Sequence, residues 1–371
     1  MTVEEFFEGL RYEFFTGVPD STLSPICDYL MRHKGLSKEH IIAANEGNCV
    51  GLAAGYYMAT GKVPVIYLQN SGIGNLVNPI ASLLNEKIYR IPCLFLVGWR
   101  GEPGVHDEPQ HLFQGEITHR LLEDLGVHTF TVSKSTTQEM WQAMMAQVDA
   151  LLAARKQAAI VISKGAITAD IKGDYGNAYS LMREKAISQI VAQAPDDIFV
   201  ASTGKIAREL FAVRETLHQD HAKDFLTVGS MGHCSSIALE IALQKPERRV
   251  WCLDGDGALL MHMGAMAVIG SFAPANMVHV VFNNESHESV GGYPTAIGSV
   301  DLCKVAQNVG YQSVHMADTA DSLQQRLAEI RGQSALTLLE IRTAIGSRAD
   351  LGRPTISPEE NMKHFMLGLQ A

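Results

Sequence analysis

The sequence lacks a long hydrophobic run. Its 371 residues contain no stretch of about 18 consecutive apolar residues, which is the length that a membrane-spanning helix needs. The amino-terminal segment MTVEEFFEGLRYEFF is acidic, whereas a secretory signal starts with basic residues and continues into an apolar run. We therefore expect a cytoplasmic protein with no membrane partner.

Paired cysteines are also missing. No two cysteines are spaced as Cys-x-x-Cys, so the sequence predicts neither a zinc site nor a disulfide framework and fits a reducing cytoplasm. We interpret each cysteine as a small buried apolar residue. The six positions are Cys27, Cys49, Cys93, Cys234, Cys252 and Cys303.

Charged residues are few, and positive charge is in deficit. Only 19% of the residues are charged and 46% are hydrophobic, which excludes a disordered or fibrous protein. Thirty Lys and Arg against forty Asp and Glu give a net charge of −10, so a nucleic-acid partner is not expected. A few local cations can still bind a small anionic substrate, which is the partner that we expect.

Short apolar runs alternate with helical patterns along the whole chain. In the first half, strands are predicted at 40–44, 63–69, 93–98 and 159–163, with helices at 47–59, 73–85 and 139–154. In the second half, strands are predicted at 198–202, 225–229, 250–254, 278–283 and 336–342, with helical segments after each except the last. Such alternation predicts an α/β fold with two doubly wound parallel-sheet domains.

The segment 168–180 is polar, contains glycine and shows no periodicity, so it is predicted to be a linker. At roughly 150 residues per domain, the length also suggests two domains. We expect the first domain over residues 1–167 and the second over residues 181–371, ending in a C-terminal tail. In open α/β sheets, ligands bind beyond the carboxyl ends of the strands, so functional residues are sought there.

A Gly-Asp-Gly turn, residues 255–257, follows the predicted strand 250–254, and the next strand leads into Asn284. A carboxylate and a carboxamide at neighbouring strand ends are oxygen ligands of the kind that Mg²⁺ takes. Gly255 and Gly257 let the backbone approach a phosphate at the start of the following helix. The turn alone leaves an alternative open, in which Asp256 only caps that helix.

The strand–helix–strand segment from Gly255 to Asn284 resembles the signature of thiamine diphosphate (ThDP) enzymes, a Gly-Asp-Gly turn followed after one helix and one strand by Asn-Asn. The resemblance implies that Asp256, the Asn284 side chain and the Ser286 backbone carbonyl hold Mg²⁺ against the diphosphate of the cofactor. Asn283 is expected to support the turn.

Two further strand ends fit the same family. Residues 202–204 follow a strand and open a helix, which suits a diphosphate contact. Residues 228–232 resemble the family segment that passes under the bent middle of the cofactor, where Met231 takes the position of an apolar wedge. A core methionine is the alternative reading of Met231. The cofactor-binding residues expected here are Ser202, Thr203, Gly204, Ser230 and Met231.

Glu46 lies between an apolar strand and an Ala/Gly-rich helix, an unusual place for a carboxylate. Taken alone, it also fits a first-turn helix residue favoured by the helix dipole. The segment from Glu46 to Tyr56 resembles the E-x-x-x-x-x-x-A-x-G-Y segment of the family's pyrimidine domain. The resemblance implies that Glu46 hydrogen-bonds N1′ of the aminopyrimidine from an apolar site that raises its pKa. Residues 69–75, which contain Ser71 and Gly72, resemble the second cofactor loop of that domain.

In this family the cofactor lies between the pyrimidine domain of one subunit and the diphosphate domain of another. The resemblance therefore implies a homodimer or larger homo-oligomer with the cofactor at the subunit interface. Relatives such as pyruvate decarboxylase have a third, middle domain, for which 371 residues leave no room.

Four loop segments, 17–21, 98–104, 107–111 and 346–354, resemble the compact phosphonopyruvate decarboxylases. This resemblance implies a carboxy-lyase that converts 3-phosphonopyruvate to phosphonoacetaldehyde and CO₂ in phosphonate biosynthesis. Guanidinium groups in such loops are suited to bind a phosphonate, and a histidine there can transfer protons. The catalytic residues expected are Glu46, Asp20 and His111, and the substrate-binding residues expected are Asp20, Arg100, His106, Arg348 and Arg353.

Alternatives remain open at this point. Each arginine also fits a solvated surface residue, and His111 also fits a loop histidine without a role. The same chemistry on 3-sulfopyruvate and an acetolactate-type carboligase acting on 2-keto acids are rival functions. A non-catalytic ThDP-fold subunit is a rival of another class, against which the intact Glu46, Asp256 and Asn284 argue.

Overall fold

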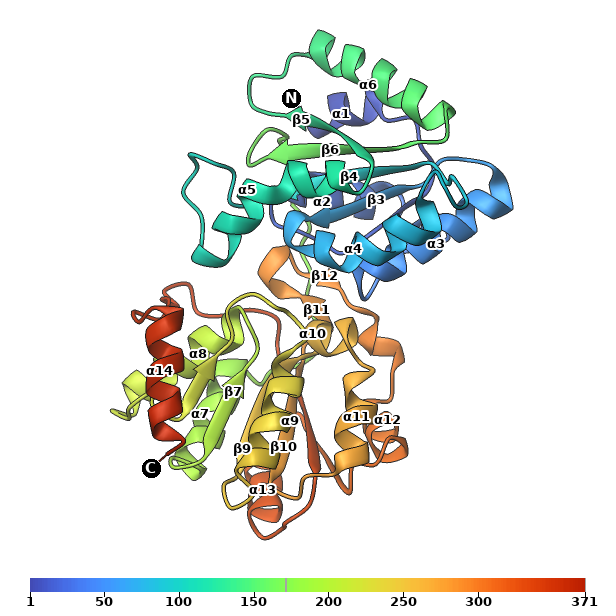
Figure 1. Cartoon of the computed structure of the whole chain (residues 1–371). Helices are drawn as coiled ribbons and strands as arrows, with labels where there is room; N and C mark the ends of the chain where they lie inside the picture. Colours follow the sequence, from blue (N-terminus) through green and yellow to red (C-terminus); the bar gives the residue numbers. More distant parts are fainter. Residues whose placement is uncertain (171, 371) are drawn as a thin grey trace. The chain divides into compact units, whose positions relative to one another are not determined.

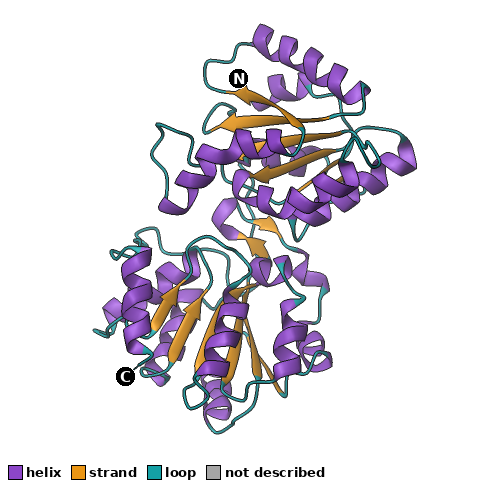
Figure 2. Ribbon diagram, viewed as in Figure 1, coloured by secondary structure: helices purple, strands orange, loops and turns teal. Residues whose placement is uncertain are grey.

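The computed structural model describes residues 1–170 and 172–370, and the chain divides into two compact units, 1–174 and 175–371. Residue 171, within the predicted linker 168–180, and residue 371, at the end of the predicted second domain, lie outside the described residues. Each unit contains a six-stranded parallel sheet with helices packed on it (Figures 1 and 2). The predicted fold class is therefore confirmed.

The sheet of the first unit has the strand order β2-β1-β3-β4-β6-β5. Its strands are β1 (Phe15–Gly17), β2 (His40–Ile42), β3 (Val65–Gln69), β4 (Cys93–Trp99), β5 (Val127–Val132) and β6 (Gln157–Ser163). The helices are α1 (Val3–Gly9), α2 (Ser24–His33), α3 (Glu46–Thr60), α4 (Ile73–Pro79), α5 (Pro109–Asp124) and α6 (Gln138–Ala153).

The structure corrects the predicted first half at three places. The three-residue strand β1 is too short to show a period, and the edge strand β5 alternates too weakly between buried and exposed positions to be recognised. The predicted helix 73–85 is interrupted, because Pro79 ends α4 and a π-helical turn, Ile80–Leu84, follows it. Proline lacks the N–H that a continuing α-helix uses.

The sheet of the second unit has the order β13-β14-β10-β9-β7-β8, and a two-stranded hairpin, β11-β12, lies beside it. The strands are β7 (Ile198–Ala201), β8 (Asp224–Leu226), β9 (Val250–Gly255), β10 (Met277–Asn283), β11 (Ser286–His287), β12 (Tyr293–Pro294), β13 (Ser313–Ala317) and β14 (Thr337–Arg342). The helices are α7 (Arg183–Gln193), α8 (Lys205–Thr216), α9 (Cys234–Gln244), α10 (Asp256–Met261), α11 (Ala265–Phe272), α12 (Leu302–Asn308), α13 (Ala320–Arg331) and α14 (Pro358–Gly368).

All five strands predicted in the second half are present, and β13 is an edge strand that the pattern missed. The expectation that no helix follows the last strand was wrong, because α14 packs against β8.

In the second unit, side chains from the two faces of the sheet form two separate hydrophobic cores. Trp251 and Leu253 of β9 pack with residues of α7, α8 and α13, whereas Val250 and Cys252 pack with residues of α9, α11 and α14. Five of the six cysteines are buried and Cys303 is half-buried, and all six are free thiols. No helix in the described ranges is long and apolar enough to span a membrane.

Candidate active site

Asp256 begins α10, immediately after the central strand β9. Its side chain is 3% exposed, and Thr295 Oγ1 donates a hydrogen bond to Asp256 Oδ2 at 2.7 Å. Burial raises the pKa of Asp256 to about 7, because desolvation outweighs the hydrogen bonds from Thr295 and nearby backbone N–H groups. A bound cation would favour the ionised form of this buried carboxylate.

Asn284 follows β10, the neighbour of β9 in the sheet, and is also buried. Its Oδ1 accepts a hydrogen bond from the Ser286 N–H at 3.1 Å, and its backbone oxygen accepts one from Asn177 Nδ2 at 2.9 Å. Ser286 Oγ is buried and has no hydrogen-bond partner among the described residues. Carboxylate, amide and backbone oxygens thus gather at these two strand ends, and this donor set fits Mg²⁺.

The loops after β7 and β8 are joined by a hydrogen bond from the Gly229 N–H to Thr203 Oγ1 at 3.1 Å. Ser230, the next residue, has a φ of 44°, which is uncommon for a residue other than glycine and costs conformational energy. Met231 is half-buried beside the Gly-Asp-Gly turn, with its Cε 3.6 Å from the position that a Cβ at Gly257 would take. The structure therefore brings Thr203, Met231 and the turn together at one edge of the sheet. Ser202 is buried and Gly204 is exposed at the same loop.

Glu46 is the first residue of α3, and the Asn45 side chain caps that helix by accepting from the Gly47 N–H at 2.7 Å. Glu46 is only 5% exposed, and burial raises its pKa, although a hydrogen bond from Asn75 opposes this shift. Gly72 packs directly against the carboxyl group, since a Cβ there would lie 2.3 Å from Oε1. A buried carboxyl group of raised pKa is what activation of ThDP through N1′ requires, so the site fits that cofactor.

Asp20 is fully buried at the carboxyl ends of the first sheet. Its Oδ1 accepts from Gln69 Nε2 at 2.6 Å, and its Oδ2 accepts from the Thr22 N–H at 2.9 Å. Burial raises the pKa of Asp20, while Gln69 and the charge of Arg100 oppose the shift. Gln69 in turn accepts from Ser71 Oγ at 2.6 Å, which links Asp20 to the exposed Ser71 of the cofactor loop.

Arg100 and His111 lie near Asp20. The charge of Arg100 opposes the rise in the pKa of Asp20, and the charges of Arg100 and Asp20 both act on the pKa of His111. Arg100 forms a bidentate ion pair with Asp107, with Nε to Oδ2 at 2.7 Å and Nη2 to Oδ1 at 2.5 Å. Burial, followed by the positive charge of Arg100, lowers the pKa of His111. His111 Nδ1 is buried without a hydrogen-bond partner within the described part of the chain. His106 is exposed in the loop before α5.

Comparison with known proteins identifies both units. The N-terminal TPP (thiamine pyrophosphate, another name for ThDP) binding domain of thiamine pyrophosphate enzymes matches residues 4–121, and the C-terminal TPP binding domain matches residues 203–341. The phosphonopyruvate decarboxylase of Streptomyces viridochromogenes is 33% identical over 96% of this chain and 91% of its own. That of Streptomyces hygroscopicus is 32% identical over 96% and 90%. The chain belongs to the phosphonopyruvate decarboxylase family of ThDP-dependent enzymes.

A third relative is the sulfopyruvate decarboxylase of Methanosarcina acetivorans, which is 29% identical over 94% of this chain and 94% of its own. The protein is thus a ThDP-dependent carboxy-lyase. Glu46 lies within the first matched domain, and Asp256 and Asn284 lie within the second.

The two C-terminal arginines of this decarboxylase have different surroundings from Arg100. Arg348 is exposed, and its Nε lies 2.9 and 3.1 Å from the carboxylate oxygens of Glu184, with Nη1 3.0 Å from Asp350 Oδ2. Arg208 of α8 donates to the Gly352 oxygen at 2.8 Å, which anchors the same segment, and Arg353 is exposed beyond it. Glu184 and Asp350 offset much of the charge of Arg348.

Several polar partners at the site were not predicted from the sequence. Gln69 is the last residue of β3 and Asn75 lies in the first turn of α4. Both belong to the segment 69–75 that resembles the second cofactor loop, but their contacts with Asp20 and Glu46 were not predicted. Thr295 follows the short hairpin strand β12, which carries no recognisable pattern, so no sequence signal indicated it.

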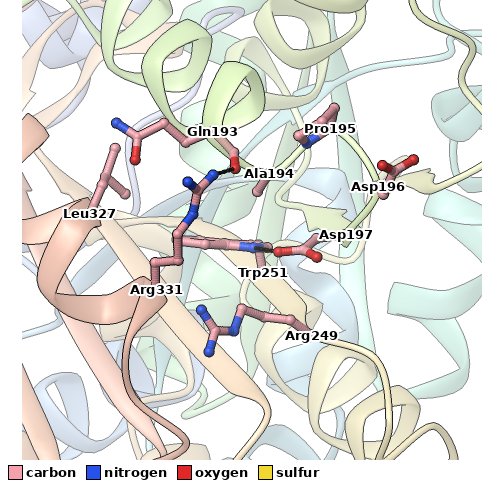
Figure 3. A pocket seen from close by; sticks show the side chains of 9 residues that line it. All are labelled: Gln193, Ala194, Pro195, Asp196, Asp197, Arg249, Trp251, Leu327 and Arg331. Atoms are coloured by element: carbon pink, nitrogen blue, oxygen red, sulfur yellow. Dashed lines mark hydrogen bonds between the residues drawn. The ribbon is translucent and has the colours of Figure 1, made fainter.

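A cavity of about 300 Å³ lies at the other end of the second sheet (Figure 3). Asp197 and Arg249 precede β7 and β9, and Asp197 Oδ2 accepts from Trp251 Nε1 at 2.8 Å. Arg331 of α13 donates to the Gln193 backbone oxygen. Because these residues sit at the amino-terminal ends of the strands, the cavity is separate from the candidate active site.

Proposed function

We propose that the protein decarboxylates 3-phosphonopyruvate to phosphonoacetaldehyde and CO₂, with Mg²⁺ and ThDP as cofactors, as a step of phosphonate biosynthesis in the cytoplasm. The observation that carries the proposal is the nearly full-length likeness to two phosphonopyruvate decarboxylases. The buried Glu46 and the oxygen-rich strand ends of Asp256 and Asn284 support it. The six free cysteines fit the reducing compartment.

The residues would divide the work of holding the cofactor. When bound, ThDP supplies the electron sink that allows a 2-keto acid to lose its carboxylate. Glu46 would hold a proton at N1′ of the aminopyrimidine, and Asp256, Asn284 and the Ser286 carbonyl would hold Mg²⁺. The diphosphate would lie against residues 202–204 and the Gly-Asp-Gly turn, with Ser230 and Met231 under the centre of the cofactor and Ser71 and Gly72 near Glu46.

The substrate needs cations for its phosphonate and a proton for its product carbon. Arg100, Arg348 and Arg353 are proposed to bind the phosphonate because guanidinium groups match its geometry, and His106 is proposed as a further basic residue of the same loops. His111, together with Asp20, would move the proton. The lowered pKa of His111 favours its neutral imidazole, and Nδ1, which has no hydrogen-bond partner among the described residues, is proposed as the nitrogen that exchanges the proton.

We further propose a homodimer or larger homo-oligomer, with the cofactor between the first unit of one subunit and the second unit of another. Sulfopyruvate decarboxylases with separately named beta and alpha subunits, each matching about a third of this chain, support an assembly of this kind. Analytical ultracentrifugation of the active enzyme should show a dimer or a larger species. A fully active monomer would contradict this proposal.

Decarboxylation of 3-sulfopyruvate is the second candidate function, favoured by the likeness to the Methanosarcina acetivorans enzyme. A coupled aldehyde assay with phosphonopyruvate, sulfopyruvate and pyruvate distinguishes the two, provided that kcat/KM is compared. We expect phosphonopyruvate to give the highest value. A higher kcat/KM for sulfopyruvate would make sulfopyruvate the substrate and would leave the proposed ThDP chemistry unchanged. Formation of acetolactate from pyruvate would indicate a carboligase.

A further inference from the structure

Glu288 connects the candidate metal ligand Asn284 to a group of buried and half-buried charges. Glu288 Oε2 accepts a hydrogen bond from Asn284 Nδ2 at 2.9 Å. The same oxygen lies 2.8 Å from Arg183 Nη1, and Oε1 lies 2.6 Å from Lys205 Nζ. Two cations, from α7 and α8, therefore fix the carboxylate in front of the Asn284 amide.

Arg183 is itself held rigidly. Its Nε and Nη2 lie 2.6 and 2.9 Å from the two carboxylate oxygens of Glu209, and both side chains are buried. A bidentate pair of this kind restricts both position and angle. The position of Glu288 is thus set by α7 and α8, two helices of the second unit, rather than by its own loop alone.

The hydrogen bonds determine which way the Asn284 amide faces. Oδ1 accepts from the Ser286 N–H at 3.1 Å, while Nδ2 donates to Glu288. If the amide were turned over, its NH₂ would face the Ser286 N–H and its oxygen would face a carboxylate, so both contacts would become repulsive. A hard cation binds the amide oxygen and not the NH₂ group, so the orientation decides whether Asn284 is a ligand.

We propose that Glu288 is a positioning residue for metal binding: it holds the Asn284 amide so that Oδ1 is presented to Mg²⁺. The inference rests on the proposed role of Asn284 as a metal ligand. Glu288 itself would not touch the metal, but its replacement should lower the affinity of the site for the metal.

Glu288→Gln tests the inference through binding of Mn²⁺, a paramagnetic substitute for Mg²⁺. The new amide has a single, uncharged oxygen for three donors, Arg183, Lys205 and the Asn284 amide. The contact that holds the Asn284 amide should therefore be weakened or lost. We expect Mn²⁺ affinity at saturating ThDP, measured by electron paramagnetic resonance, to fall about 10- to 100-fold, the range typical of residues that orient metal ligands. Excess Mg²⁺ should restore kcat.

Glu209→Gln is the matched control. It removes the other carboxylate that pairs with Arg183 but does not contact Asn284. Its melting temperature should fall, whereas its Mn²⁺ affinity should fall much less than that of Glu288→Gln, because Glu288 keeps its contacts with Lys205 and Asn284. Equal losses of Mn²⁺ affinity in both variants would mean that Glu288 acts only through the stability of the charged network, and the inference would be overturned.

A donor–acceptor exchange gives a second test of the direct contact between residues 284 and 288, with Asn284→Asp rather than the wild type as its reference. Asn284→Asp alone places two carboxylates against each other, and adding Glu288→Gln supplies a donor for the new acid. The double variant should therefore bind Mn²⁺ more tightly than Asn284→Asp alone, and no improvement would contradict direct coupling.

Asp256→Ala separates this inference from the proposal on which it rests. If Asp256→Ala loses Mn²⁺ while Glu288→Gln keeps wild-type affinity, the positioning role fails and the metal site stands. If Asp256→Ala itself keeps wild-type affinity, the metal site lies elsewhere, and the proposed role of Asn284 fails with it.

Discussion

Asn75 Nδ2 donates a hydrogen bond to Glu46 Oε2 at 2.7 Å. This bond ties the first residue of α3 to α4, just after the loop that follows β3, while Gly72 packs against the other carboxyl oxygen. The carboxyl group is thereby fixed in a buried place in which its neutral form is favoured. The proposed activation of the cofactor depends on this arrangement.

Glu46→Gln should abolish most of the activity. Glutamine has nearly the same shape but cannot share a proton with N1′, so we expect a rate loss of at least ~10³, on the order of 4 kcal/mol of barrier. Hydrogen–deuterium exchange at C2 of the bound cofactor measures the activation step directly. Glu13→Gln, which removes an exposed carboxylate paired with Lys62, serves as the control and should exchange normally. Near-wild-type exchange in Glu46→Gln would refute the assignment.

Asp256→Ala should weaken cofactor binding. If Asp256 holds Mg²⁺ as proposed, the variant should lose the metal and with it the anchor of the diphosphate, so saturation should require far more ThDP. Titration calorimetry of ThDP in the presence of Mg²⁺ measures the effect. Asp196→Ala, at an exposed residue paired with Lys223, should bind as the wild type does. An unchanged affinity in Asp256→Ala would place the metal site elsewhere.

The raised pKa of Asp256 predicts how the stability of the cofactor-free protein varies with pH. Its pKa moves from 3.8 to about 7 on folding, so between these values the folded protein holds a proton that the unfolded chain has released. Stability contributed by this site should therefore fall as pH rises from about 4 to about 7. Melting temperatures across this range should drop less in Asp256→Asn than in the wild type. Parallel curves would show that the site is not desolvated as the structure indicates.

The C-terminal arginines are tested by comparing substrates. If Arg348 or Arg353 binds the phosphonate, its replacement by Ala should lower kcat/KM for phosphonopyruvate by an amount that corresponds to roughly 1.5–3 kcal/mol. Residual turnover of pyruvate, which lacks the phosphonate, should hardly change. Glu184→Gln removes the ion-pair partner of Arg348 and controls for loss of local structure. Equal losses on both substrates would assign the arginines to folding or to a subunit interface.

The sequence predicted the parts of the fold that local patterns determine. The buried strand β4 is a continuous apolar run, and β10 is one interrupted only by His279 before its final Asn283, so both were recognisable. The Gly-Asp-Gly turn at the end of β9 was recognisable from its spacing to Asn284. The edge strands β5 and β13 were missed because half-exposed positions blur the pattern.

Only those site residues that belong to a recognisable sequence motif could be predicted. Glu288 is held by Arg183 and Lys205, which lie 105 and 83 positions away, and Thr295 bonds Asp256 across 39 positions, so no local motif indicates these contacts. The pairing of Arg348 with Glu184 joins residues 164 positions apart, so it emerges only from the folded chain.

The central claim is tested most directly by following phosphonopyruvate itself with ³¹P NMR in the presence of the enzyme, ThDP and Mg²⁺. The account predicts that the phosphonopyruvate signal is replaced by that of phosphonoacetaldehyde, with one CO₂ released for each molecule, and that Glu46→Gln leaves the substrate signal unchanged over the same time. An unchanged phosphonopyruvate signal with the wild-type enzyme, under conditions in which it turns over sulfopyruvate or pyruvate, would contradict it.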